Sequence, residues 1–145
     1  MSLNRIGLML VIGAAACVAT AAHADEQDDI DYRQHIMNTL GEQMAAIQLI
    51  VQHKAPADNF ATHVQIVAVT AATAKSAFKA EVAGGKAKPD VWANWTDFSK
   101  RLDELVASSA ALAKSAQQGG VQATAAKLDT LKCKGCHDVY REEKK

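Results

Sequence analysis

Two cysteines and a histidine lie close together near the end of the chain. They stand in "LKCKGCHDVYREEKK", where Cys133, Cys136 and His137 form the pattern C-x-x-C-H. On a helix the two sulfur atoms lie about one turn apart and can bond to the two vinyl groups of one porphyrin, while the histidine directs a ring nitrogen at its iron. The pattern is the attachment signal for a c-type haem. The spacing therefore predicts one covalent haem c.

Three other uses of this pattern compete with haem attachment. A thioredoxin-like C-x-x-C needs a β-α-β setting, and the chain has no strand pattern. A structural zinc site needs four ligands, and the remaining histidines, none of them paired with a cysteine, are His23, His35, His53 and His63. A disulfide across one helical turn would distort the helix. Haem attachment is the interpretation that the pattern favours.

The first 24 residues resemble a signal peptide. "NR" precedes the apolar run "IGLMLVIGAAACVATAA", which ends in "AHA" before the acidic "DEQDD". We expect cleavage after Ala24, which removes Cys17 and leaves a mature domain of residues 25–145. A retained anchor is the alternative, although the run is shorter than the roughly 20 residues of a spanning helix. Export would place the two remaining cysteines in an oxidising compartment.

The length and charge of the chain exclude some classes of function. A chain of 145 residues fits one domain. Lys plus Arg and Asp plus Glu both number 16, and there is no basic block or glycine-rich phosphate loop, so nucleic-acid binding is not expected. The adjacent carboxylates Asp103 and Glu104 diverge by about 100° on a helix, so they do not share a site. The chain is not expected to be an enzyme.

Apolar residues recur in steps of three and four along four segments, which predicts four amphipathic helices. The first helix is expected from Asp28 to about Lys54, with His35 on its polar side. The second and third helices follow the apolar stripes Phe60–Phe78 and Val91–Leu112. The fourth helix begins near Val121 and continues into the cysteine motif. "KAPAD", "AGGKAKPD" and "QQGG" separate them. We expect an all-α, up-down-up-down, antiparallel four-helix bundle.

Methionine is the candidate for the other side of the iron. In such a bundle the first and fourth helices are antiparallel neighbours, and at 1.5 Å per residue Met37 lies level with His137, whereas Met44 is about 10 Å deeper. Met37 is therefore the predicted sixth ligand, and the alternative is that it only packs against the porphyrin. Iron bound by His and Met is associated with electron transfer, while an open position would admit nitric oxide or carbon monoxide.

Two arginines share helical faces with the predicted iron ligands. Arg141 follows His137 by four residues, and Arg33 precedes Met37 by four. Either cation could pair with a haem propionate. On spacing alone, an ordinary solvated arginine is an equally good interpretation of each.

The segments "DYRQHIMNTLGEQM" and "CKGCHDVYR", together with four helices, resemble the cytochrome c′ family, including its low-spin, methionine-ligated members. The likeness covers residues 25–145. It implies that Cys133 and Cys136 form the thioether bonds and that His137 is the proximal ligand. Met37 falls where the family has either a sixth ligand or an apolar residue that blocks the distal site. The resemblance also implies that Arg141 lies near the proximal face, that Arg33 is a propionate partner, and that periplasmic homodimers form through the first two helices.

Two functions follow from these expectations. The first is a periplasmic electron carrier with one covalent haem, serving redox partner proteins that the sequence does not identify. The alternative is a five-coordinate, high-spin protein that binds nitric oxide or carbon monoxide behind an unbonded Met37.

Overall fold

The computed structural model describes residues 25–143, and these are helical apart from the connecting loops and two isolated β-bridges. The predicted signal segment, with Cys17 and Ala24, lies outside the described residues. The elements in chain order are α1 Glu26–Val51, η1 Ala57–Asn59, α2 Phe60–Ala77, α3 Asp90–Ala93, α4 Trp95–Thr124, η2 Ala125–Leu131 and α5 Cys133–Tyr140, where η denotes a 3-10 helix. No helix in the described range has the length and apolar character needed to cross a membrane.

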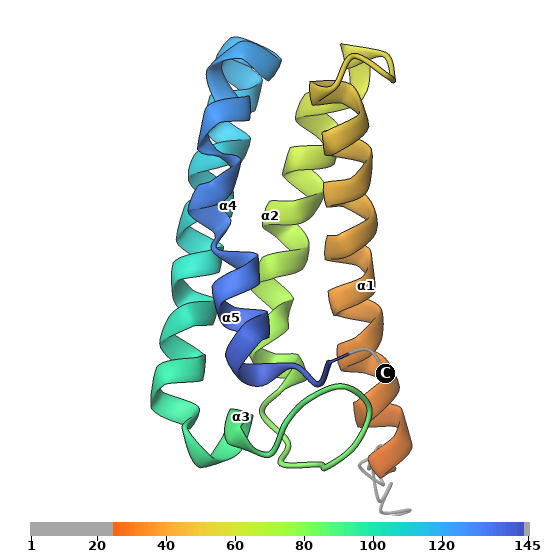
Figure 1. Ribbon diagram of the computed structural model, residues 1–145, viewed down its shortest axis with the longest axis vertical. Coiled ribbons are helices and arrows are strands. Elements are labelled where there is room, and N and C mark those ends of the chain that lie inside the picture. The colour runs from red at the N-terminus through yellow and green to blue at the C-terminus, as the bar shows by residue number, and fades with distance from the viewer. Residues whose placement is uncertain (1–24, 144–145) are drawn as a thin grey trace, which may run out of the picture.

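Four rods run along the long axis of the molecule (Figure 1). They are α1, α2, α4 and the final segment made of η2 and α5, and each runs in the direction opposite to the rod before it. The expected all-α, up-down-up-down four-helix bundle is confirmed. The loop between α2 and α3 lies at the end of the bundle that also holds α5 and the beginning of α1 (Figure 1).

The first helix begins at a capping box. The Asp25 carboxylate accepts a hydrogen bond from the Asp28 amide at 2.8 Å, and the Asp28 carboxylate accepts one from the Asp25 amide at 3.4 Å. This exchange satisfies donors that a helix start leaves free, so α1 begins two residues earlier than the apolar stripe suggested. It ends at Val51, before a left-handed turn at His53 with φ 57°.

The predicted stripe of the second segment is a buried face. All six stripe residues of the second segment are buried: Phe60, Val64, Val67, Ala71, Ala74 and Phe78. Buried side chains form two groups along the bundle. The first apolar cluster consists of Ile47, Ile50, Phe60, Val64, Val67, Leu112, Ala113, Ala116, Leu128 and Leu131. The second apolar cluster consists of Ala74, Ala77, Phe78, Val91, Phe98, Leu102 and Tyr140.

The predicted continuous fourth helix is wrong, because the segment is divided in three. Gly120, with φ 58° and ψ −147°, interrupts the helical backbone of α4 and turns the chain, and a short helical stretch follows it up to Thr124. The chain then forms the 3-10 helix η2. Lys132, at φ 51° and ψ 29°, ends η2 and precedes α5. The C-x-x-C-H motif therefore lies on a short helix of its own.

Candidate functional site

The three predicted attachment residues lie on α5. Cys136 and His137 are half-buried, Cys133 is more exposed, and both cysteines are free thiols. The amide of Cys136 donates to the Lys132 carbonyl at 3.3 Å, which closes the first turn of α5. Desolvation raises the pKa of both thiols. Neither sulfur is bonded to another group, so both are available for covalent attachment.

Met37 and Cys136 pack against the same apolar cluster. Each is a half-buried residue in contact with the second apolar cluster, Met37 from α1 and Cys136 from α5. Met44, one step deeper along α1, packs instead against the first apolar cluster. His53 is exposed beyond the end of α1, and the His63 ring is hydrogen-bonded to Gln43 at 2.7 Å. Of these side chains, Met37 is the one placed at the same buried cluster as the cysteine motif.

Arg33 is buried, with 2% of its surface exposed. Its Nη2 donates to the Gly84 carbonyl at 2.7 Å, and its Cζ lies 5.2 Å from the centroid of the Trp92 ring. Gly84 has φ 123°, and a Cβ there would come within 2.9 Å of Ile30 Cδ1. The loop can therefore approach α1 closely because this residue is a glycine. The solvated interpretation of Arg33 is wrong.

One donor of this buried guanidinium has no acceptor. Nη1 of Arg33 forms no hydrogen bond with any described residue. Burial lowers the pKa of Arg33, and the nearby Asp29 opposes this effect. A buried cation with an unused donor is costly unless an anion accepts from it. The carboxylate of a haem propionate is such an acceptor. The free thiols, the histidine and this unpaired donor together fit a covalent haem.

Arg141 follows α5 at the surface. Its amide donates to the His137 carbonyl at 3.0 Å, and its backbone pairs with Ala87 in an isolated β-bridge. Its side chain is exposed and forms no ion pair or hydrogen bond within residues 25–143. Burial first, and the charge of Arg141 second, lower the pKa of His137. The imidazole is therefore favoured in its neutral form, which is the form that binds iron.

A group of polar residues on α4 was not identified from the sequence. Asp97 Oδ2 accepts from Arg101 Nε at 2.6 Å and from Tyr140 Oη at 2.6 Å. The hydrogen bonds from Tyr140 and Arg101 hold the pKa of Asp97 below its usual value, while burial and the Asp97 bond raise the pKa of Tyr140 to about 12. The i,i+4 spacing of Asp97 and Arg101 could have predicted the ion pair between them. No sequence spacing could have predicted the hydrogen bond from Tyr140, which is distant in the sequence.

A groove of about 630 Å³ lies between α4 and the final segment. Its walls include the apolar side chains of Leu102, Leu105 and Leu131, and Cys136 lines it as well. The volume is within the range of small-molecule sites in proteins. Cys136 is thus bordered by the groove as well as by the second apolar cluster.

Known proteins similar to this chain are described as cytochromes. The sequence model of the family described as Cytochrome C′ matches residues 28–141. Cytochrome c′ of Alcaligenes xylosoxydans xylosoxydans is 25% identical over 125 residues, which cover 83% of this chain and 98% of the relative. Cytochrome c-556 of Agrobacterium fabrum is 28% identical over 151 aligned residues, which cover 99% of each. A solved nitric oxide complex of a mutant cytochrome c prime from Alcaligenes xylosoxidans is similar with a TM-score of 0.76 and 25% identity, covering 84% of this chain and 99% of that one.

Proposed function

Because the chain belongs to the cytochrome c′ family, whose members carry one covalent haem c with its iron, we propose that it is a periplasmic electron carrier. The haem supplies an iron that cycles between the ferrous and ferric states. In this proposal Cys133 and Cys136 form the two thioether bonds, His137 is the proximal ligand, and Met37 is the sixth ligand.

The observation that carries this proposal is the shared packing of Met37 and Cys136. The two residues are far apart in the sequence, yet both contact the second apolar cluster. A haem anchored at Cys136 would therefore have the Met37 thioether at its own level in the bundle. The buried rings of Phe98 and Phe78 in the same cluster, with centroids 5.1 Å apart, would exclude water from that level. Histidine and methionine ligation is associated with electron-transfer cytochromes and raised potential.

The two arginines have different roles in this proposal. The unpaired Nη1 of buried Arg33 would donate to a haem propionate. Arg141 would act on the proximal side through its charge, because it is exposed and its field already reaches His137.

A gas-binding protein is the second candidate. The similar solved structure that is described as a nitric oxide complex favours it. In that case Met37 would pack over the haem without bonding to iron, and the open position would take nitric oxide or carbon monoxide.

The export of the chain and its assembly are part of the same proposal. We propose that signal peptidase cleaves after Ala24, that the mature protein resides in the periplasm, and that it pairs as a homodimer through α1 and α2. The capping box of α1 supports the cleavage position, because Asp25, the first residue that cleavage would leave, is the N-cap of α1. The intact mass of the purified protein tests this step: a mass that corresponds to residues 25–145 plus one haem is expected.

A visible absorption spectrum of the purified holoprotein separates the two functions. An electron carrier with both iron positions filled should give a sharp low-spin ferrous spectrum that carbon monoxide does not change. A broad high-spin Soret band that shifts with carbon monoxide would instead establish the gas-binding candidate. As a control on attachment, the double variant C133S/C136S should lose covalent haem, and haem retained after denaturation would contradict the assignment of the two cysteines.

A further inference from the structure

The helix that carries the motif has little packing of its own. α5 is eight residues long, and Tyr140 is its one buried residue, while Val139 is 44% exposed. Helices this short are marginal in isolation. The left-handed residue Lys132 also separates α5 from η2, so α5 does not inherit its direction from a preceding α-helix. Other contacts must therefore fix the direction of His137.

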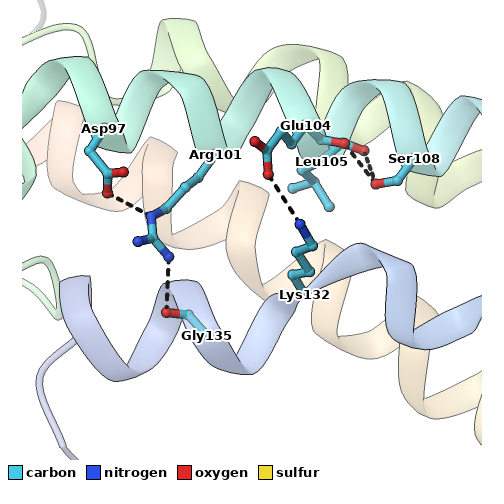
Figure 2. Close-up of polar contacts among 7 residues, drawn as sticks. All are labelled: Asp97, Arg101, Glu104, Leu105, Ser108, Lys132 and Gly135. Carbon is cyan, nitrogen blue, oxygen red and sulfur yellow. Dashed lines mark hydrogen bonds and ion pairs between the residues drawn. The ribbon is translucent and has the colours of Figure 1, made fainter.

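One face of α4 provides such contacts to residues 132–140, which we name the motif segment. Successive contacts along α4 reach residues that lie earlier and earlier in this segment, because the two run antiparallel. The α4 residues are spaced by four and three, so they share a helical face. The contacts, which we name the α4–α5 clasp, are Tyr140 Oη to Asp97 Oδ2 at 2.6 Å, Arg101 Nη1 to the Gly135 carbonyl at 3.3 Å, and Lys132 Nζ to Glu104 Oε2 at 3.5 Å. Figure 2 shows the last two contacts, which reach from α4 across to the motif segment. The clasp touches α5 on both sides of Cys136 and His137.

Arg101 is the centre of the clasp. Its Nε donates to Asp97 at 2.6 Å while its Nη1 donates to Gly135, so one guanidinium joins α4 to the backbone of the motif (Figure 2). Its Cζ also lies 5.7 Å from the centroid of the Tyr140 ring. A planar guanidinium fixes the direction of several donors at once, which a flexible ammonium group does not. Arg101 therefore constrains the angle between α4 and α5.

The exposed ion pairs around the clasp add little to stability. The side chains of Arg101 and Asp97 are 37% and 51% exposed, and those of Lys132 and Glu104 are 74% and 46% exposed. Exposed ion pairs of this kind contribute little free energy. The ordered contacts on both sides of His137 are better explained by orientation than by stability.

We propose that Arg101 is a positioning residue of the haem site, which holds the Gly135 carbonyl against α4 and so sets the direction in which His137 meets the iron. The inference rests on the proposed function, in which His137 is the proximal ligand. Hydrogen bonds that orient an iron ligand, and the groups around it, tune the reduction potential. Loss of the Arg101 guanidinium should therefore alter the spectrum and the reduction potential of the haem while lowering the stability of the protein only a little.

The experiment compares holoproteins with Arg101→Gln and Asp103→Asn substitutions. Asp103 is the matched control, because it forms an exposed pair on α4 with Lys75 of α2, at 2.8 Å and with side chains 62% and 43% exposed, that does not involve α5. Midpoint potential, ferric electron paramagnetic resonance and hydrogen exchange of the α5 amides are measured. Arg101→Gln should shift the potential, broaden or split the ferric signal and speed exchange in α5, while Asp103→Asn should leave all three at wild-type values.

A third variant, Arg101→Lys, separates position from charge. The lysine keeps the positive charge but not the planar fork, so it should show the same direction of change as Arg101→Gln. A wild-type potential and spectrum in Arg101→Lys would overturn the proposal, because charge alone would then explain the effect. Equal behaviour of Arg101→Gln and Asp103→Asn would overturn it as well. If the Arg101→Gln protein fails to accumulate, Arg101→Lys is compared with Asp103→Asn instead, and the same three measurements test the proposal. A wild-type protein without covalent haem would instead refute the proposed function itself.

Discussion

Met37 is the residue on which the choice between the two functions depends. Met37→Ala should remove the sixth ligand, so the ferrous spectrum of the variant should respond to carbon monoxide while that of the wild type does not. Because the side chain is half-buried, the loss of unfolding free energy should be about 1–3 kcal/mol, at the low end for such truncations. Absorption spectra with and without the gas measure the first effect, and chemical denaturation measures the second.

Met44→Ala is the control for Met37. Met44 is also half-buried on α1, but it packs against the first apolar cluster. The control should lose stability to a similar extent with no change in the response to carbon monoxide. A wild-type protein that binds the gas as readily as Met37→Ala would show that Met37 does not bond to the iron.

Arg33 is the residue tested by a second prediction. Replacement of Arg33 by Gln removes a buried positive charge from the proposed propionate, and this disfavours the uptake of an electron. A lost interaction of about 1 kcal/mol corresponds to a potential lower by roughly 40 mV for one electron. Redox titration measures this, with Lys86→Gln as the control, since Lys86 is exposed in the same loop and its charge is screened by water. Equal potentials in the two variants would exclude Arg33 as a propionate partner.

At the scale of the elements, the sequence predicted the parts of the bundle that depend on burial. The stripe of α2 matches the buried face at all six positions because apolar periodicity records which side of a helix faces the core. The division of the predicted fourth helix into the end of α4, η2 and α5 has no comparable signal in the apolar pattern. Leu128 and Leu131 are three residues apart, a spacing that suits an α-helix and the 3-10 helix η2 equally well. The left-handed Lys132 carries no signal of its own, because lysine is not typical of that conformation.

The residues of the candidate site also differ in whether the sequence could predict them. The C-x-x-C-H residues could be predicted because their chemistry needs a local spacing. The burial of Arg33 could not, because it depends on the carbonyl of Gly84 in a loop that is distant in the sequence. The clasp around Arg101 was missed for the same reason, since the carbonyl that it binds has no residue-type signal.

Gly120 provides a prediction about the break itself. Its φ of 58° and ψ of −147° belong to a region that is almost restricted to glycine. A Cβ at this position would meet no atom within 4 Å, so the cost of Gly120→Ala is one of backbone conformation and should be about 1–3 kcal/mol of unfolding free energy. The control is Gly41→Ala within α1, where a Cβ also meets nothing within 4 Å. In a regular helix this change should stabilise by about 0.5–1 kcal/mol. Denaturant titrations that gave both variants the same sign would contradict this account.

At the scale of the whole molecule, the two apolar clusters divide the bundle into unequal ends. The first apolar cluster joins α1, α2, α4 and η2 through protein side chains alone. The second apolar cluster is bordered by Met37 and Cys136 and receives a single buried residue, Tyr140, from α5. In the proposed function the haem completes the packing of this second end. The stability of the bundle should therefore depend on haem unevenly along its length.

Hydrogen exchange on the C133S/C136S variant tests this dependence. Without covalent haem, the amides of residues 133–140 and of the loop around Gly84 should exchange at least about tenfold faster than in the holoprotein, which corresponds to about 1.4 kcal/mol of local opening free energy. The amides near Ile47 and Val64 should change much less, because their packing does not involve the haem. Serine is close to cysteine in size, so the substitutions themselves create no large cavity. A uniform increase along the chain would show instead that the two ends unfold as one unit and that the haem stabilises both.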